Sequence, residues 1–194
     1  PQRAEIRPVP HRQTKPGQLH RLQKALWLPL GQSRNTPDEP FHISLAEWSL
    51  NRALRAGTLT NLDFPRVAKR DYEIDCIELV DQLFKDKSKD MDYLGELKSR
   101  AGDEGVRIGL IMLDTNGSLG TPKESSRSRA IDKTYAWIDA AAFLGCKTVR
   151  VNARGDKDPD ELLKWVSESC ATLSDYAAKR NINVTIENHG GPSS

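Results

Sequence analysis

The chemistry-bearing residues of this chain cluster near its end, at Glu187-Asn188-His189. A carboxylate and an imidazole two positions apart share one face of an extended strand, so both can reach one metal ion or one substrate. Together they suit Mn²⁺, Zn²⁺, Co²⁺ or Fe²⁺, and Mg²⁺ where carboxylates dominate. Gly190-Gly191 follows and lets the backbone turn sharply. A solvated loop end or a Glu–His hydrogen bond would give the same pattern, so the surrounding elements are needed to choose.

Short β-rich runs alternate with helical patterns from residue 41 onward. The midpoints of these runs lie roughly 32 to 40 residues apart, the length of a strand with its crossover helix. Five such repeats in the chain predict a parallel α/β fold. The predicted strands are residues 43–49, 76–80, 106–113, 148–152 and 183–187.

Helix boundaries support this alternation. Thr121-Pro122-Lys123-Glu124 predicts an N-cap, a proline at the first helical position and a capping-box glutamate. Asp158-Pro159-Asp160-Glu161 has the same order, with Asp as the cap. Gly105 and Gly145 stand where helices should end before the next strand.

The two faces of the predicted strands differ in polarity. In residues 148–152, Val149 and Val151 share one face, while Arg150 and Asn152 share the other. An aliphatic outer face and a polar inner face favour a barrel over an open sheet that is covered on both sides. Chemistry in such barrels lies at the carboxyl ends of the strands. The residues expected there are Trp48, Asn152, Glu187 and His189.

Six short motifs together carry a family resemblance, and they lie at residues 41–49, 61–65, 74–80, 143–146, 149–153 and 186–191. Over residues 41–194 the chain resembles the xylose isomerase-like, or sugar phosphate isomerase/epimerase, TIM barrels. The resemblance implies a (β/α)8 barrel and a role in carbohydrate metabolism. It is specific to the superfamily and does not identify a substrate.

The resemblance also implies a site. Proteins of this family hold one divalent metal (Mn, Mg, Co or Zn) through a glutamate at the end of the fifth strand and through Asp, His or Gln, and Glu from later strands. It places the first of these ligands on Glu187, which would also move a proton through an enediolate. Trp48 would wall the sugar site, Asn152 would line its floor, and His189 would face the substrate or support the ligand. For the inward-facing Glu78, a buried pair with Arg150 is the favoured interpretation.

The chain departs from the family in length. A complete barrel needs about 250 residues, and only five strands are recognised here, so we expect a barrel truncated after strand five. The later ligands are then absent, which predicts an incomplete and inactive fragment. Its open sheet edges would favour self-association. The alternatives are a non-catalytic interaction module, a dehydratase, or an endonuclease IV-like enzyme. The last is disfavoured because a three-zinc cluster needs many histidines, whereas residues 41–194 hold only His42 and His189.

Composition separates a leader from this barrel segment. Residues 1–40 hold seven of the 11 prolines and seven Lys or Arg against three Asp or Glu, a net charge of +4. This predicts a disordered leader. A signal peptide has little support because the one apolar piece, residues 25–30, is short and broken by Pro29. The remaining residues carry a net charge of −2.

The same composition limits the partners. No apolar run approaches the ~20 residues of a membrane span, and a net charge of +2 makes nucleic acid a poor candidate. Cys76, Cys146 and Cys170 are far apart and form no CxxC pair, so we expect buried thiols in a reducing compartment. The chain is therefore expected in the cytoplasm, with an exported precursor left open, and a small sugar is its expected ligand.

Overall fold

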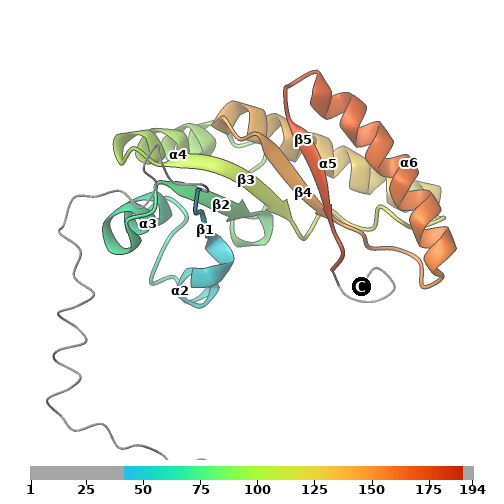
Figure 1. Ribbon diagram of the computed structural model, residues 1–194, viewed down its shortest axis with the longest axis horizontal. Helices are drawn as coiled ribbons and strands as arrows, with labels where there is room; N and C mark the ends of the chain where they lie inside the picture. The colour runs from blue at the N-terminus through green and yellow to red at the C-terminus, as the bar shows by residue number, and fades with distance from the viewer. Residues whose placement is uncertain (1–41, 190–194) are drawn as a thin grey trace, which may run out of the picture. The chain divides into compact units, whose positions relative to one another are not determined.

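Five parallel strands form the sheet of residues 42–189, the part of the chain that the computed structural model describes (Figure 1). They lie side by side in chain order: β1 (Leu45–Ala46), β2 (Cys76–Val80), β3 (Arg107–Leu113), β4 (Thr148–Asn152) and β5 (Asn183–Glu187). The predicted α/β fold and the last four predicted strands are confirmed. The first strand is shorter than predicted because a 3-10 helix begins at Glu47.

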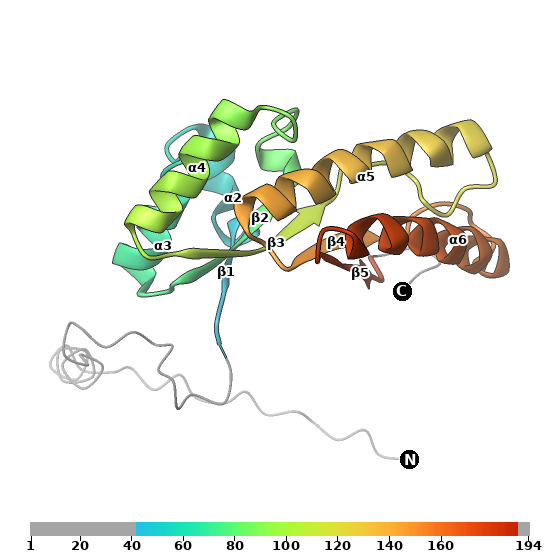
Figure 2. The same cartoon turned by 90° about the horizontal axis from the view of Figure 1, so that it is seen from above.

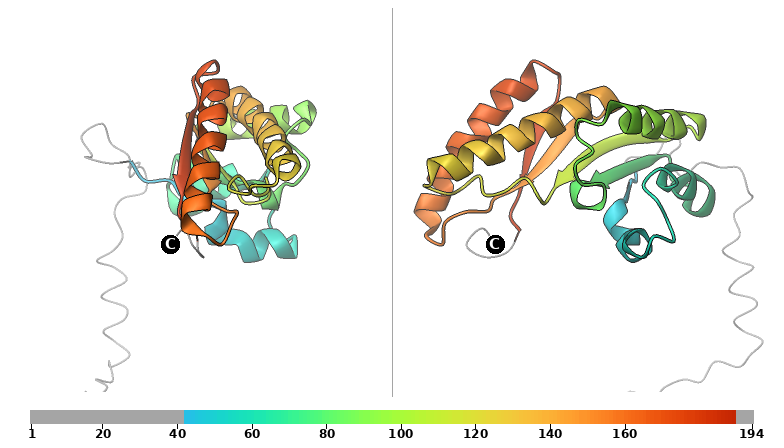
Figure 3. Two further views of the ribbon diagram at one scale, coloured as in Figure 1. Left: turned by 90° about the vertical axis from the view of Figure 1, so that its right-hand side faces the viewer. Right: turned by 180° about the vertical axis from the view of Figure 1, so that it is seen from behind.

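Helices connect the strands, and the long ones lie together on one side of the sheet. Helices α4 and α5 are behind the strands in Figure 1 and in front of them in the right-hand view of Figure 3. Figure 2 shows the same arrangement from above, and α6 packs against both α5 and β5. The elements are η1 (Glu47–Leu50), α2 (Asn51–Ala56), α3 (Phe64–Tyr72), η2 (Asp81–Leu83), α4 (Met91–Asp103), α5 (Glu124–Leu144) and α6 (Pro159–Ala178).

The hydrophobic core lies between these helices and the sheet. Strand residues of the aliphatic face are fully buried there, as the alternation predicts: Ile77, Leu79, Ile111, Leu113, Val149 and Val151. They belong to one cluster with buried helix residues such as Leu94, Leu97, Ile138 and Leu173. Because neighbouring strand residues point to opposite faces, burying this set directs the polar set of each strand away from the helices.

The predicted helix boundaries are partly right. Asp158 caps α6, and its Oδ1 accepts hydrogen bonds from the backbone N–H groups of Asp160 (2.9 Å) and Glu161 (3.1 Å). Gly145 ends α5 in the left-handed conformation, with φ 86°. The predicted start of α5 at Thr121 is wrong. Lys123 is still extended, so the helix begins at Glu124, and Thr121 accepts only a turn-like bond from the Lys123 N–H.

A glycine pair joins the loop before α5 to the loop after β4. The Gly120 N–H donates to the Arg154 carbonyl (2.8 Å), and the Asp156 N–H donates to the Gly120 carbonyl (2.9 Å). A Cβ on Gly155 would lie 2.1 Å from Gly120 backbone atoms, and one on Gly120 would lie 2.4 Å from Leu162. Only glycine allows this approach, which fixes the Arg154 backbone.

We expect Gly155→Ala to lower the free energy of unfolding by about 3 kcal/mol, because the added methyl group collides with backbone rather than with a flexible side chain. Gly95→Ala is the matched control. A Cβ at Gly95, inside α4, meets nothing within 4 Å, so the exchange should stabilise by about 0.5–1 kcal/mol. Urea denaturation of both variants measures the difference. Equal stability of the two variants would contradict the close approach.

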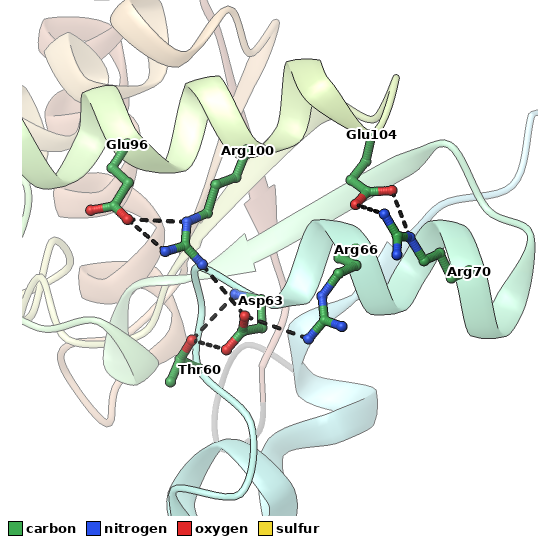
Figure 4. A network of polar contacts seen from close by, with 7 residues as sticks. All are labelled: Thr60, Asp63, Arg66, Arg70, Glu96, Arg100 and Glu104. Atoms are coloured by element: carbon green, nitrogen blue, oxygen red, sulfur yellow. Dashed lines mark hydrogen bonds and ion pairs between the residues drawn. The ribbon is translucent and has the colours of Figure 1, made fainter.

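A network of charged side chains joins α3 to α4 (Figure 4). Arg70 makes two hydrogen bonds to Glu104, of 3.0 and 2.7 Å, and Arg100 bridges Glu96 (2.6 Å) and Asp63 (3.4 Å). Most of these side chains are well exposed. Exposed ion pairs contribute about 0–1 kcal/mol each to stability. The network is therefore a solvated set of contacts between the two helices that adds little to the free energy of unfolding.

Beyond β5 the outer surface is apolar. Leu163 and Ile186 are 67% and 51% exposed. With Pro159, Leu162 and Val166 they line an apolar cleft of about 280 Å³. This cleft does not test the predicted self-association through open sheet edges, which stays a prediction.

The cysteines and the helices also bear on predictions made from the sequence. The three cysteines are free and buried, and no helix within residues 42–189 has the length and apolarity to cross a membrane. The predicted leader, residues 1–40, and Gly190-Gly191 lie outside the described residues.

Candidate functional site

A cavity of about 440 Å³ opens at the carboxyl ends of the strands. Every described strand, or the residues directly after it, contributes to its wall. The lining residues are Ala46, Trp48, Val80, Gln82, Met112, Asp114, Arg150, Arg154, Glu187 and His189. The cavity therefore occupies the edge of the sheet where barrel enzymes place their chemistry.

Strand register brings the polar residues of this edge to one level. Asn152 pairs directly with Glu187 across β4 and β5. Leu113 pairs with Val151, so Asp114, the next residue, lies level with Asn152. Three residues from three consecutive strand ends thus meet, although at least 35 residues separate each from the next.

Asp114 is the centre of the polar contacts. Its Oδ1 accepts from Asn152 Nδ2 (2.8 Å) and Arg150 Nη1 (3.2 Å), and its Oδ2 accepts from Gln82 Nε2 (2.9 Å). Burial alone would raise the pKa of Asp114, but the hydrogen bond from Asn152, the Arg150 charge and the Gln82 bond outweigh it, so the pKa is lowered. The carboxylate is therefore ionised at neutral pH, and both of its oxygens accept hydrogen bonds from protein side chains.

Arg150 links Asp114 to Glu187. Its Nη1 lies 2.8 Å from Glu187 Oε2 and also donates to Asn152 Oδ1. The Arg150 side chain is 13% exposed and that of Glu187 is 43% exposed. Glu187 lines the cavity, and its Oε1 has no hydrogen-bond partner among the described residues.

The predicted pair of Glu78 with Arg150 is wrong. Glu78 instead accepts a hydrogen bond from Ser44 Oγ (2.6 Å). Register explains the difference: Glu78 pairs with Leu110, two residues before Met112, whereas Arg150 is level with Met112. The guanidinium extends toward the carboxyl ends, away from the level of Glu78.

The cavity contains three of the four residues predicted from the sequence. Trp48, Glu187 and His189 line it. Asn152 does not; it is 3% exposed and holds Asp114 and Arg150 in place. Trp48 is 45% exposed, with the Arg55 guanidinium 5.0 Å from its ring. Their roles toward a substrate stay predictions.

Sequence reasoning missed Gln82, Asp114 and Arg154. Gln82 and Asp114 follow strands 76–80 and 107–113 within two residues, so their place after a predicted strand was the available signal. Nothing in the sequence distinguishes Arg154 from other loop arginines.

Two further buried carboxylates fix the loops around the cavity. Glu47 is fully buried and accepts from Asn61 Nδ2 (2.6 Å) and the Val80 N–H (2.7 Å). Burial raises the pKa of Glu47 to about 8, against the smaller opposing effect of these two bonds. Asp81, also fully buried, accepts from the backbone N–H groups of Asp114 and Thr115. The residues before α2 and after β3 are thereby tied to the end of β2.

The described residues do not by themselves fit a metal ion. Within residues 42–189 no three His, Cys, Asp or Glu side chains lie close enough to hold one. Asp114 uses both of its oxygens on protein donors, and Glu187 pairs with Arg150. A metal at Glu187 would need further ligands from outside this set.

Comparison with known proteins places the chain in a family. A family model described as xylose isomerase-like TIM barrel matches residues 67–194. "Probable endonuclease 4" of Haloarcula marismortui is 26% identical over 110 residues, which span 57% of this chain and 39% of that protein.

Two solved structures show the same fold. D-psicose 3-epimerase, solved in the presence of D-fructose, has a TM-score of 0.62 at 14% identity, over 79% of this chain and 54% of that one. The IOLI protein with a binding zinc atom has a TM-score of 0.57 at 14% identity, over 75% and 51%. The chain thus spans about half the length of these structures. By fold and by sequence, this chain belongs to the xylose isomerase-like TIM barrel family, and its five parallel strands form part of such a barrel.

Proposed function

We propose that the cavity is part of the site of an isomerase or epimerase that acts on a small sugar or a sugar-like hydroxy-ketone. The observation that carries this proposal is the Glu187 carboxylate, held by Arg150 at the end of β5 with one oxygen free at the cavity. Trp48 supplies an apolar wall beside amide and charged groups, a combination that suits the faces and hydroxyls of a sugar. The similarity to D-psicose 3-epimerase supports the same substrate class.

The chemistry is a proton transfer beside a carbonyl. Glu187 Oε1 takes the proton from the hydroxyl-bearing carbon next to the carbonyl, which leaves an enediolate. In an isomerase it returns this proton to the former carbonyl carbon, while the hydroxyl proton passes to the former carbonyl oxygen. In an epimerase the first proton stays on Glu187, and a second acid on the opposite face donates a different proton to the same carbon. Arg150 keeps Glu187 oriented, and its positive charge favours the ionised carboxylate that the first step requires.

A divalent metal belongs to this proposal only if further ligands complete the site. Glu187 would supply one ligand, and the others would have to come from residues outside the described set. The zinc atom in the IOLI structure supports a metal in this family. The first proton transfer described above uses Glu187 of this chain, whereas the second acid of an epimerase would come from outside the described residues.

The chain alone is expected to bind sugar without converting it. The described cavity holds one carboxylate with a free oxygen, and epimerisation needs a second acid group. An endonuclease function is not proposed, although one relative carries that name. Residues 42–189 hold only two histidines, His42 and His189, whereas the three-zinc cluster of such an enzyme needs many.

The test joins residues 42–189 to the remaining strands of D-psicose 3-epimerase and compares this protein with the full chain. Each is incubated with D-fructose and Mn²⁺ in D₂O. We expect the joined protein to exchange the proton beside the carbonyl and to form the epimer, both detected by NMR, and the chain alone, which lacks the second acid, to form no epimer. A folded joined protein that exchanges no proton on any of a panel of ketoses would contradict the proposal.

A further inference from the structure

Arg150 has hydrogen-bond donors that the protein leaves unused. Its contacts with the described residues all go through Nη1, which reaches Asp114, Asn152 and Glu187. Nε and Nη2, which carry three of the five guanidinium N–H groups, have no acceptor within residues 42–189. The side chain is only 13% exposed, yet no buried side-chain nitrogen of the described residues lacks a hydrogen-bond partner. Nε and Nη2 therefore keep contact with solvent and are open to an acceptor that enters the cavity.

Arg154 is a second cation on the same cavity. Its Nη1 donates to the Asp114 backbone carbonyl (3.2 Å), and it forms no ion pair with any carboxylate of the described residues. The loop that carries it is fixed by the close approach of Gly120 and Gly155. The Arg154 guanidinium is therefore held near Asp114 by a rigid backbone and not by a partner of opposite charge.

The charges of the cavity are unevenly paired. Asp114 and Glu187 both make ion pairs with Arg150, whereas Arg154 makes none with a carboxylate of residues 42–189 and only helps to lower the pKa of Asp114 through its charge. Guanidinium groups present parallel donors that match the oxygens of carboxylates and phosphates, which a neutral hydroxyl does not satisfy equally. Two such groups on one cavity of about 440 Å³ can hold one anion between them.

We propose that Arg150 and Arg154 bind the anionic group, a carboxylate or a phosphate, of the small molecule that occupies this cavity. The anion accepts from Arg150 Nε and Nη2 and from the Arg154 guanidinium, while Arg150 Nη1 keeps its bonds to Asp114 and Glu187. The proposal rests on the proposed function in taking this molecule to be the substrate. Its residues all lie in the described part of the chain, so binding tests it without turnover.

Isothermal titration of the full chain, at constant ionic strength, compares matched ligands. D-ribose 5-phosphate is paired with D-ribose, and D-gluconate with D-sorbitol. We expect at least one anion to bind about 10- to 100-fold more tightly than its neutral partner, the range for hydrogen bonds to charged groups. If both anions bind, the arginines recognise the negatively charged oxygens that phosphate and carboxylate share. If only one binds, the recognised group is that one, phosphate or carboxylate.

Variants assign the effect to the two arginines. Arg154→Ala should remove most of this preference, and it should fold because the side chain is exposed. Arg150→Lys keeps the positive charge but loses the parallel donors of the guanidinium group, so the affinity for the anion should fall about 10-fold. Arg129→Ala makes the same charge change on the surface of α5, outside the cavity, and should bind as the wild type does.

The outcomes separate this inference from the proposed function. Equal affinity for each anion and its neutral partner overturns the inference, as does an anion preference that survives Arg154→Ala; neutral-sugar binding would leave the proposed function standing. Arg154-dependent anion binding, together with no proton exchange in the joined protein, supports the inference and contradicts the proposed function.

Discussion

Replacing Glu187 by glutamine is expected to lower kcat/KM of the joined barrel protein by about 10²- to 10⁴-fold, the usual contribution of a general base. Glutamine has the same shape, and its amide oxygen can contact Arg150 where Glu187 Oε2 makes its ion pair, so the cavity keeps its shape, but the amide cannot take a proton from the substrate. Binding of a ketose should change much less than its conversion. Steady-state kinetics and proton exchange in D₂O measure both.

Glu168→Gln is the matched control for this experiment. It makes the same chemical change on α6, at an exposed residue outside the cavity, and should leave the kinetics unchanged. If Glu187→Gln keeps wild-type exchange, Glu187 is not the base, and the proposed function loses the observation that carries it.

The second large effect is expected at Glu47, whose burial makes folding sensitive to pH. The pKa of Glu47 is raised from 4.5 to about 8 in the folded protein. The folded state therefore binds a proton more tightly than the unfolded state. This contribution to stability is complete below pH 4.5, falls as the pH rises toward 8, and is lost above that value.

Glu47→Gln should remove this dependence. Its amide mimics the neutral acid: the oxygen accepts from the Val80 N–H, and the nitrogen donates to Asn61 after that side chain turns its amide over. Above pH 8 the variant should be more stable than the wild type by up to about 5 kcal/mol, which is the pKa change expressed as free energy. Near pH 4.5 the two should be about equal.

Urea denaturation at pH 5, 6.5 and 8.5 measures this difference, with Glu168→Gln as an exposed control that should follow the wild type. A constant difference between Glu47→Gln and the wild type at all three pH values would mean that Glu47 stays ionised inside the protein. In that case its bonds to Asn61 and Val80 compensate for its burial.

The sequence alone determined the alternation of strands and helices and the direction in which each strand faces. These properties depend on residues that are neighbours along the chain. The Asp158 cap is made by atoms within three residues, and the inner position of Glu187 follows from the period of two in β5. For the same reason, the family motifs were sufficient to predict the barrel.

Only the tertiary structure decided which polar groups meet at the carboxyl ends of the strands. The contacts of Asp114 with Gln82, Arg150 and Asn152 join residues 32 to 38 positions apart. They depend on strand register and on how far a long side chain reaches. Arg150 reaches past the level of Glu78 to Glu187, and Glu47 becomes buried only when β2 lies beside it. Local pattern therefore placed the strands and Glu187, whereas packing between strands built the charged cavity around that residue.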